Sequence, residues 1–220
     1  RILLDWLAYV VQNAGKRINW AILLQGAQGT GKSYFAKVLE WVLGSNAKSL
    51  DPSALGERFT GWAHGSVVNI VEEIRIKGDD KWRIMDRLKP FITNSMIQIE
   101  EKGRDHRTVP NFTNYLLLTN YKDALPITND DRRFCVMYGR IQNEQELFDF
   151  FGGREQTADY FENLFAESEK HAGGIKGFLL NYKISDEFKA SGRAPDTSSR
   201  KAMIQATISP EQCSVEDLIN

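Results

Sequence analysis

The sequence predicts an α/β fold, in which helices sandwich a P-loop sheet that carries an inserted β-hairpin and is followed by a helical C-terminal part. Three observations predict it. A strand-like run at residues 18–25 precedes a glycine-rich loop and an amphipathic helix. Continuous apolar runs, typical of buried strands, recur at residues 66–71 and 114–119. From residue 144 onward, apolar side chains recur at helical spacing. Strands separated by helices are typical of a mainly parallel sheet.

The first part of the chain alternates between helix and strand signals. Residues 2–13 place apolar side chains at helical spacing, and Gly26 ends the strand that follows. The helix after the glycine-rich loop is expected to stop at Gly44. Another helix is expected from residue 81 and should end at Lys89-Pro90, because proline disfavours helical backbone in the residue before it.

A hairpin, further strands and a helical region follow. Residues 96–101 and 107–112 flank a glycine-containing turn, which predicts two paired strands. Residues 133–138 could form one more strand. Gly152-Gly153 and Gly173-Gly174 are expected to separate helices, and Asp196 or Thr197 is expected to cap the last one.

These elements suggest two parts. Residues 1–140 are expected to form the P-loop core, with the hairpin near 96–112. Residues 141–220 are expected to form a helical extension packed on the core, with the last ~20 residues as a linker or partly ordered tail. The aromatic side chains around Phe148, Phe151 and Phe161 are predicted to pack in the core, because their spacing is helical.

Composition excludes several classes of protein. The 220 residues are 42% hydrophobic, which supports a globular core, and no apolar run is long enough for a membrane span. Cys135 and Cys213 lie far apart without a Cys/His cluster, which argues against structural zinc and favours a reducing compartment. The net charge of −1 gives no indication that the chain binds nucleic acid.

We expect a cytoplasmic protein, in the host cell if it is phage-encoded. The chain opens without Met, so we expect it to be part of a longer protein.

The stretch "GAQGTGKS" at residues 26–33 matches the phosphate-binding P-loop pattern GxxxxGK[ST]. Glycines let backbone N–H groups converge on a phosphate, and the following helix N-terminus adds positive potential. Lys32 can reach the β- and γ-phosphates, and the Ser33 hydroxyl can hold Mg²⁺. The predicted nucleotide-binding residues are Gly26, Ala27, Gln28, Gly29, Thr30, Gly31, Lys32, Ser33 and Tyr34.

Polar residues follow the two later buried strands. Glu72 and Glu73 come directly after one, and Asn120 ends the other. We assign Glu72 to the metal and Glu73 to activation of the attacking water, with Asn120 touching the γ-phosphate or positioning that water. The alternative for the two carboxylates is a solvated pair at a strand end.

Arg133 lies shortly after Asn120, in "NDDRRF". An arginine here can stabilise charge on the γ-phosphate, often from a neighbouring subunit. The alternative is that Arg132 and Arg133 form surface ion pairs with Asp130 and Asp131.

The motifs "GAQGTGKS", "VVNIVEE", "IEEKG" and "LLLTN" occur in this order within a short span. Their order resembles the superfamily 3 helicases of the AAA+ class, and most of all the helicase part of phage and mobile-element primase-helicases or primase-polymerases. The resemblance covers roughly residues 1–205 and implies an AAA+-type sheet. It also implies ring oligomers, with six subunits expected, that hydrolyse ATP with Mg²⁺ at subunit interfaces and move along single-stranded DNA. A primase or polymerase domain is expected elsewhere in the full-length chain.

The resemblance also assigns residues. Arg133 matches the family's interface arginine finger, with Arg132 beside it, and Lys89 matches a second basic residue presented to the neighbour's nucleotide. For Lys89 a solvated lysine at a helix end remains the alternative. Lys102 matches a DNA-contacting hairpin lysine. Gly103 departs from members that carry a second DNA-contacting side chain there, and the candidates to compensate are Arg104, His106 and Arg107.

Two other functions remain open on the sequence alone. One is an AAA+ ATPase that remodels or loads a protein partner, and the other is a nucleotide-binding scaffold for a replication complex. Stimulation of hydrolysis by DNA separates the first from a helicase, and phosphate release separates the second from any ATPase.

Overall fold

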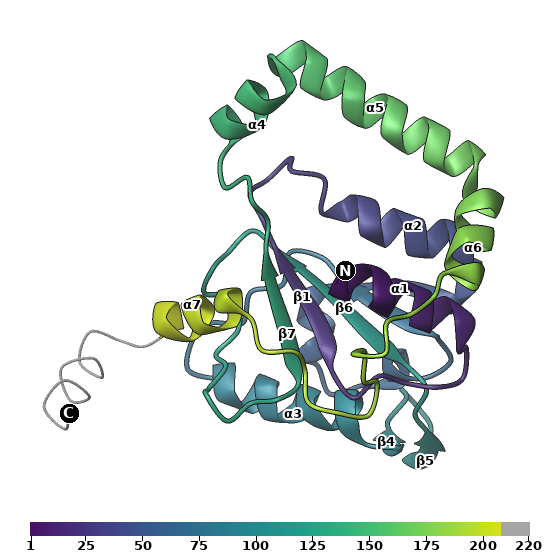
Figure 1. Cartoon of the computed structure of the whole chain (residues 1–220). Helices are drawn as coiled ribbons and strands as arrows, with labels where there is room; N and C mark the ends of the chain where they lie inside the picture. Colours follow the sequence, from purple (N-terminus) through teal and green to yellow (C-terminus); the bar gives the residue numbers. More distant parts are fainter. Residues whose placement is uncertain (208–220) are drawn as a thin grey trace, which may run out of the picture.

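A computed structural model describes residues 1–207 of the chain and confirms an α/β fold. Its centre is a five-stranded sheet with the order β2-β3-β6-β1-β7, and all neighbouring strands pair in parallel (Figure 1). The strands are β1 (Ala21–Gln25), β2 (Ala47–Leu50), β3 (Val68–Val71), β6 (Asn114–Thr119) and β7 (Phe134–Tyr138). Four of them match strands predicted from the sequence. The strand β2 was not predicted, because its half-exposed residues AKSL lack an apolar pattern.

Helices cover both faces of this sheet, as predicted. Alternate residues of β1 point to opposite sides: Ile22 and Leu24 join one buried cluster, and Ala21 and Leu23 join the other. The helices α1 (Ile2–Gln12), α2 (Ser33–Leu43) and α6 (Ala172–Asn181) pack on the first side. The helices α3 (Lys81–Thr93) and α7 (Ser198–Thr207) pack on the second. Residues 1–207 also contain three short 3-10 helices, at Gly44–Asn46, Pro52–Leu55 and Gly61–Ala63, and the last two add buried Leu55 and Ala63 to the core.

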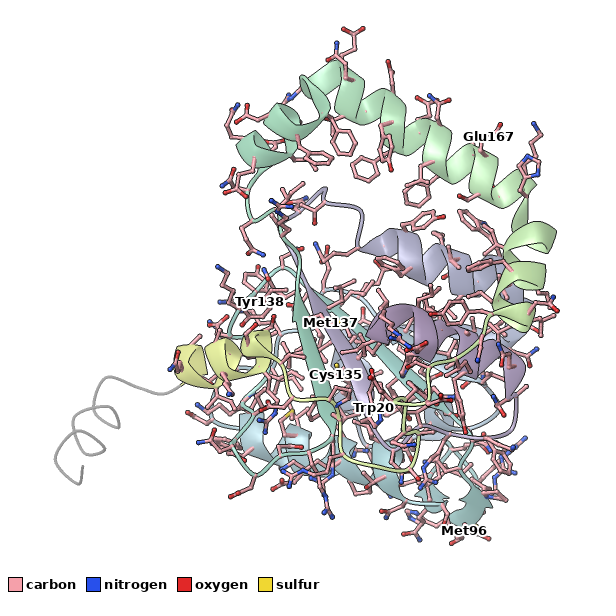
Figure 2. The ribbon with its side chains drawn as sticks, in the orientation of Figure 1. Trp20, Met96, Cys135, Met137, Tyr138 and Glu167 are labelled. Atoms are coloured by element: carbon pink, nitrogen blue, oxygen red, sulfur yellow. The ribbon has the colours of Figure 1, made fainter. Side chains whose placement is uncertain are left out.

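The expected hairpin forms from β4 (Met96–Ile99) and β5 (Arg107–Pro110), which pair antiparallel. It lies at the edge of the sheet opposite the glycine-rich loop (Figure 1). Figure 2 labels Met96 at the start of β4, at the far end of the molecule from Glu167. Ile97, Ile99 and Val109 point inward and are buried, so one face of the hairpin belongs to the core.

The predicted end of α3 at Pro90 is wrong, because the helix continues to Thr93. Pro90 lacks an N–H and so removes one helical hydrogen bond, the one to the carbonyl of Asp86. The carbonyls at the end of a helix have no partner within it, and here they are bound from outside. The Asn111 side chain donates to the carbonyl of Phe91 at 2.6 Å, and the Arg17 guanidinium donates to the carbonyls of Ile92 and Thr93.

Of three other helix boundaries, one departs from expectation and two agree with it. Gly173-Gly174 do not break a helix; they lie in the first turns of α6, and the break falls at His171. Gly152 does end a helix in left-handed conformation, with φ 86°. Thr197 caps α7, because its Oγ1 accepts from the Arg200 backbone N–H at 3.1 Å.

The helices α4 (Glu144–Phe151) and α5 (Arg154–Lys170) form an arm that runs over α2 and away from the sheet (Figure 1). We call α4 and α5 together the arm. Its phenylalanines Phe148, Phe151 and Phe161 are only partly buried, and Phe150 is 71% exposed. The prediction that these aromatic residues lie in the core is therefore wrong, because the arm packs along one side only.

Within residues 1–207, no helix combines the length and apolarity that a bilayer crossing requires. The predicted linker or tail at the C-terminus falls mostly on residues 208–220, which lie outside the described residues.

Candidate functional site

The glycine-rich loop joins β1 to α2, as the motif requires. Gly29 and Gly31 have positive φ angles of 78° and 81°, which glycine adopts without steric cost. A Cβ on Gly26 would lie 2.9 Å from Thr30 Oγ1, so a side chain there would require the Thr30 hydroxyl to move. The Thr30 hydroxyl donates to the Ala27 carbonyl at 2.8 Å and holds that turn, while the Gln28 side chain is exposed.

Lys32 folds back into the loop, where its Nζ donates to the Ala27 carbonyl at 2.6 Å. Burial lowers the pKa of this amine, while the carboxylates of Glu73 and Glu72 act in the opposite direction and favour the charged form. The acceptor of this amine is a neutral carbonyl of its own loop. A phosphate oxygen could take the place of that carbonyl.

Ser33 and Glu72 come together from two elements. The Ser33 hydroxyl donates to Glu72 Oε2 at 2.5 Å, which links the start of α2 to the end of β3. Hydroxyl and carboxylate oxygens are ligands that suit Mg²⁺, which typically uses one or two carboxylates, phosphate oxygens and water. Among the described residues no cluster of three acidic, His or Cys side chains offers a fuller cage. The donor set therefore fits Mg²⁺ held jointly with phosphates.

Glu73 has the single positive φ angle found outside glycine in residues 1–207, at 56°. Such a conformation costs about 1–3 kcal/mol in a residue with a side chain. The next residue fixes it, because buried Ile74 donates its backbone N–H to the Leu118 carbonyl at 2.9 Å. The chain thus turns sharply after β3, with Glu72 against Ser33 and Glu73 exposed.

Asn120 follows β6, which lies between β1 and β3 in the sheet. The Gly26 N–H donates to the Thr119 carbonyl at 3.2 Å, and Gln25 Nε2 donates to the Asn120 carbonyl at 3.3 Å. Asn120 therefore lies beside the first residue of the loop. The structure brings the loop, Glu72, Glu73 and Asn120 to one edge of the sheet.

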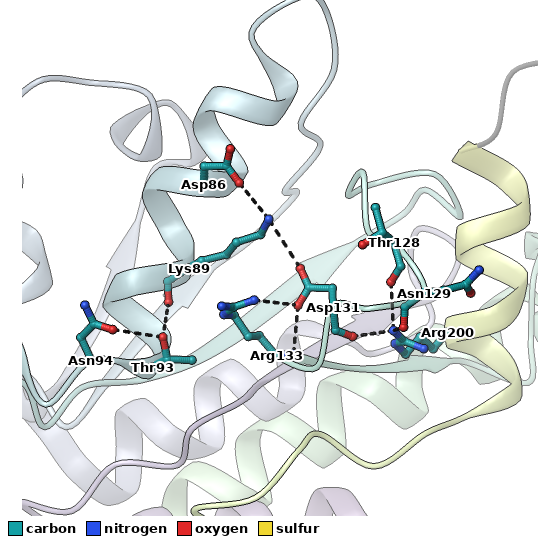
Figure 3. A network of polar contacts seen from close by, with 9 residues as sticks. All are labelled: Asp86, Lys89, Thr93, Asn94, Thr128, Asn129, Asp131, Arg133 and Arg200. Atoms are coloured by element: carbon teal, nitrogen blue, oxygen red, sulfur yellow. Dashed lines mark hydrogen bonds and ion pairs between the residues drawn. The ribbon is translucent and has the colours of Figure 1, made fainter. Parts of the chain in front are cut away.

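Arg133 and Lys89 lie at the other edge, where both contact Asp131 (Figure 3). Arg133 Nη1 lies 3.6 Å from Asp131 Oδ1, and Lys89 Nζ lies 3.9 Å from Oδ2 of the same carboxylate. Lys89 Nζ also lies 2.8 Å from Asp86. The predicted pair of Arg133 with Asp131 is present, yet its buried Nε has no acceptor among the described residues.

The position of Arg133 separates it from its own loop. It precedes Phe134, which pairs with Ala21 at the start of β1, whereas the loop begins after Gln25. At about 3.3 Å per residue this places Arg133 about 20 Å along the sheet from Gly26. Neither Arg133 nor Lys89 can complete the site of the same chain in this conformation.

Arg132 is exposed and lines a cavity of about 410 Å³ together with Arg193. Arg193 comes from the predicted loop 191–199, which the Ala194 N–H attaches to the Arg132 carbonyl at 2.8 Å. The sequence did not indicate that Arg193 lies near Arg132, or that Asp131 contacts both Lys89 and Arg133. The stretch "SGRAP" predicts only a loop, and Arg193 reaches Arg132 because the fold brings together residues 61 positions apart.

The hairpin tip is crosslinked by its own charges. Arg104 and Arg107 lie 3.1 and 3.2 Å from Glu101 Oε2, and His106 lies 3.7 Å from Glu100. Lys102 is exposed at the tip and has no ion pair or hydrogen bond with any side chain in residues 1–207. Among the four predicted nucleic-acid residues, Lys102 is thus the one whose charge is not already matched.

The arm lies against the loop from outside. A Cβ added to Gly31 would be 2.6 Å from Phe161 Cε1, and one added to Gly29 would be 4.0 Å from Leu147 Cδ2. Tyr34, which directly follows Ser33, shares a hydrogen bond of 2.9 Å between its hydroxyl and that of Ser168. In Figure 2 the side chains of α5 and α2 meet between the two helices, while Glu167 lies on the outer side.

Comparison with known proteins agrees with part of the expected resemblance. A DNA primase-polymerase of Nitratiruptor phage NrS-1 is 22% identical over 209 residues, which cover 94% of this chain and 27% of that protein. The likeness to phage primase-polymerases is thus confirmed, and the likeness to superfamily 3 helicases stays a prediction. The chain spans about a quarter of that relative's length.

Solved structures of the NrS-1 C-terminal region share the fold. One apo structure aligns with a TM-score of 0.77 at 20% identity, covering 95% of this chain and 47% of that one. Another aligns with a TM-score of 0.71 at 21% identity, covering 98% of this chain and 48% of that one.

A family model provides the last comparison. The model of a family of unknown function, DUF5906, matches residues 24–133. The matched half of the chain runs from the end of β1 to Arg133, and so includes the loop, the two glutamates, the hairpin and Asn120. The chain belongs to the DUF5906 family.

Proposed function

We propose that this chain is the ATPase module of a DNA replication protein, which hydrolyses ATP between subunits and translocates on single-stranded DNA as a helicase. One observation carries the proposal: Lys32, the Ser33–Glu72 pair at 2.5 Å, Glu73 and Asn120 converge at the carboxyl edge of one parallel sheet. Ligands of α/β sheets bind in the crevice outside the carboxyl ends of the strands, which supports a nucleotide at this edge.

In the proposed transfer of a phosphoryl group to water, each of these residues has a separate role. Backbone N–H groups of the loop hold the phosphates, and Lys32 exchanges the Ala27 carbonyl for a phosphate oxygen. Ser33 and Glu72 would hold Mg²⁺, which would supply positive charge to neutralise the phosphate oxygens. The exposed carboxylate of Glu73 accepts a proton from the attacking water, and the Asn120 amide orients that water.

A second subunit completes the site. Arg133 lies about 20 Å along the sheet from its own loop, and Lys89 lies beside it at Asp131. Both are therefore placed to reach another subunit's nucleotide. Head-to-tail contacts of this kind close into rings, and we propose a hexamer. Asp131 contacts both cations, and the buried Arg133 Nε–H has no acceptor within residues 1–207.

The hairpin supplies the DNA contact. Lys102 at the tip would contact phosphates, so binding should depend on salt and be indifferent to sequence. The NrS-1 relative is a DNA primase-polymerase, which supports DNA as the substrate and a primase or polymerase domain elsewhere in the full protein.

Phosphate release from ATP, measured with and without single-stranded DNA, tests the proposal. The chain should release phosphate, DNA should accelerate it, and Lys32→Ala should abolish it. Hydrolysis that DNA does not change would favour the protein remodeller. Nucleotide binding without hydrolysis would favour the scaffold, and the absence of both would contradict all three functions.

A further inference from the structure

The arm touches the nucleotide loop at two glycines. Phe161 lies so close to Gly31 that a Cβ there would be 2.6 Å from the ring, and Leu147 lies 4.0 Å from the corresponding position on Gly29. Tyr34 gives an independent link, because its hydroxyl meets Ser168 at 2.9 Å and its ring packs edge-on against Phe165 at 5.6 Å. The arm therefore forms one wall next to the loop.

This wall carries a group of aromatic rings that core packing does not explain. The rings of Phe151 and Tyr160 have centroids 4.4 Å apart, and Phe161 lies 5.7 Å from Phe151 and 5.3 Å from Tyr160. Tyr160 is nevertheless 47% exposed and the adjacent Phe150 is 71% exposed. Exposed aromatic clusters on a soluble protein mark binding surfaces more often than single exposed side chains do.

We propose that Phe151, Tyr160 and Phe161, here called the platform, bind the heterocyclic base of the nucleotide. The inference rests on the nucleotide-binding function proposed above. The phosphates are fixed by the loop between Gly26 and Ser33, so the base must leave the loop toward a surface that adjoins it. The arm adjoins it at Gly29 and Gly31.

The chemistry of the arm favours a base over a phosphate. Its exposed acidic side chains Glu155, Asp159 and Glu162 repel anions, whereas the platform presents aromatic rings, of which Tyr160 is 47% exposed and Phe151 and Phe161 are half-buried. Aromatic rings stack on every base, since each base has a π-face. The platform is therefore suited to the uncharged end of a nucleoside triphosphate.

Binding of ATP and of inorganic tripolyphosphate, both with Mg²⁺, separates the base from the phosphates. Tyr160→Leu and Phe161→Leu should each raise the Kd for ATP about 10-fold. Both should leave the Kd for tripolyphosphate unchanged, because it has no base. Tyr160→Phe keeps the ring and should bind ATP like the wild type.

Phe165→Leu is the matched control, because Phe165 lies on the same helix and packs on Tyr34 and Trp41 rather than on Gly31. It should leave the ratio of the two affinities unchanged. If Phe161→Leu weakened the binding of both ligands equally, the platform would be overturned and the arm would be a support for the loop. Tighter binding of ATP would also overturn it, because the arm would then obstruct the nucleotide site. A wild type that binds neither ligand would instead contradict the proposed ATPase.

Discussion

Glu73 shows how a single residue links backbone conformation to chemistry. Its φ of 56° turns the chain immediately after β3 and separates two consecutive carboxylates. Glu72 lies against Ser33, whereas Glu73 is exposed. The strain of about 1–3 kcal/mol has no packing benefit on the side chain itself, so we attribute it to the role of the carboxylate.

Glu73→Asn should therefore lower activity without lowering stability. Asn adopts the left-handed region more readily than Glu, so the free energy of unfolding should stay equal or rise by up to about 1 kcal/mol. Phosphate release should fall about 10²–10⁴-fold, because the general base is lost. Urea unfolding and a phosphate-release assay on the same preparation measure both. Glu73→Ala, as a control, should lose activity without gaining stability; a destabilised or fully active Asn variant would contradict the assignment.

Among the elements, α3 depends on partners outside itself. Pro90 removes one helical hydrogen bond, and the last turn survives because distant side chains bind its carbonyls. Asn111 is buried and donates to the carbonyls of Phe91 and Asn94 at 2.6 and 2.9 Å. This turn directly follows Lys89, so its integrity also positions a proposed interface residue.

Asn111→Ala should lower the free energy of unfolding by about 2–3 kcal/mol, since the buried carbonyl of Phe91 and the part-buried carbonyl of Asn94 lose their donor. The urea midpoint of unfolding measures the loss. Asn163→Ala, at an exposed position on α5, is the control and should change stability by less than about 0.5 kcal/mol. An Asn111 variant as stable as this control would show that α3 does not need the external donors.

At the tip of the hairpin, two arginines are paired with a carboxylate and one lysine is not. Arg104 and Arg107 share Glu101, whereas Lys102 has no such partner among residues 1–207. Lys102→Ala should weaken binding of single-stranded DNA and lower the slope of log K against log salt by about 0.7, while basal ATP hydrolysis stays unchanged. A salt titration with a labelled oligonucleotide measures this slope. Arg104→Ala should have the smaller effect, and a reversed order would move the DNA contact to Arg104.

At the scale of the whole molecule, the parallel sheet separates two groups of polar residues. The loop, the glutamates and Asn120 lie at the carboxyl edge, and Lys89, Asp131 and Arg133 lie at the amino edge, about 20 Å away. In the function that we propose, these two groups are the two halves of one site, and assembly of copies would join the loop of one subunit to the arginine of the next.

The sequence predicted the carboxyl edge well, because strand, loop and helix signals are local and parallel strands place their ends together. It could not predict the contacts that depend on distant segments. The continuation of α3 past Pro90 needs Asn111 and Arg17, and the cavity beside Arg132 needs Arg193. The aromatic spacing of the arm indicated a buried face, yet whether a face is buried depends on what packs against it. Only the structure places Phe161 on Gly31.

A mixing experiment tests the central claim, that each site combines the loop of one subunit with Arg133 of the next. Lys32→Ala and Arg133→Ala should each be nearly inactive alone in phosphate release with single-stranded DNA present. Mixed in equal amounts under exchange conditions, they should recover activity, because about a quarter of the interfaces then pair an intact loop with an intact arginine. A mixture as inactive as its components, or an Arg133→Ala variant as active as the wild type, would contradict the shared site.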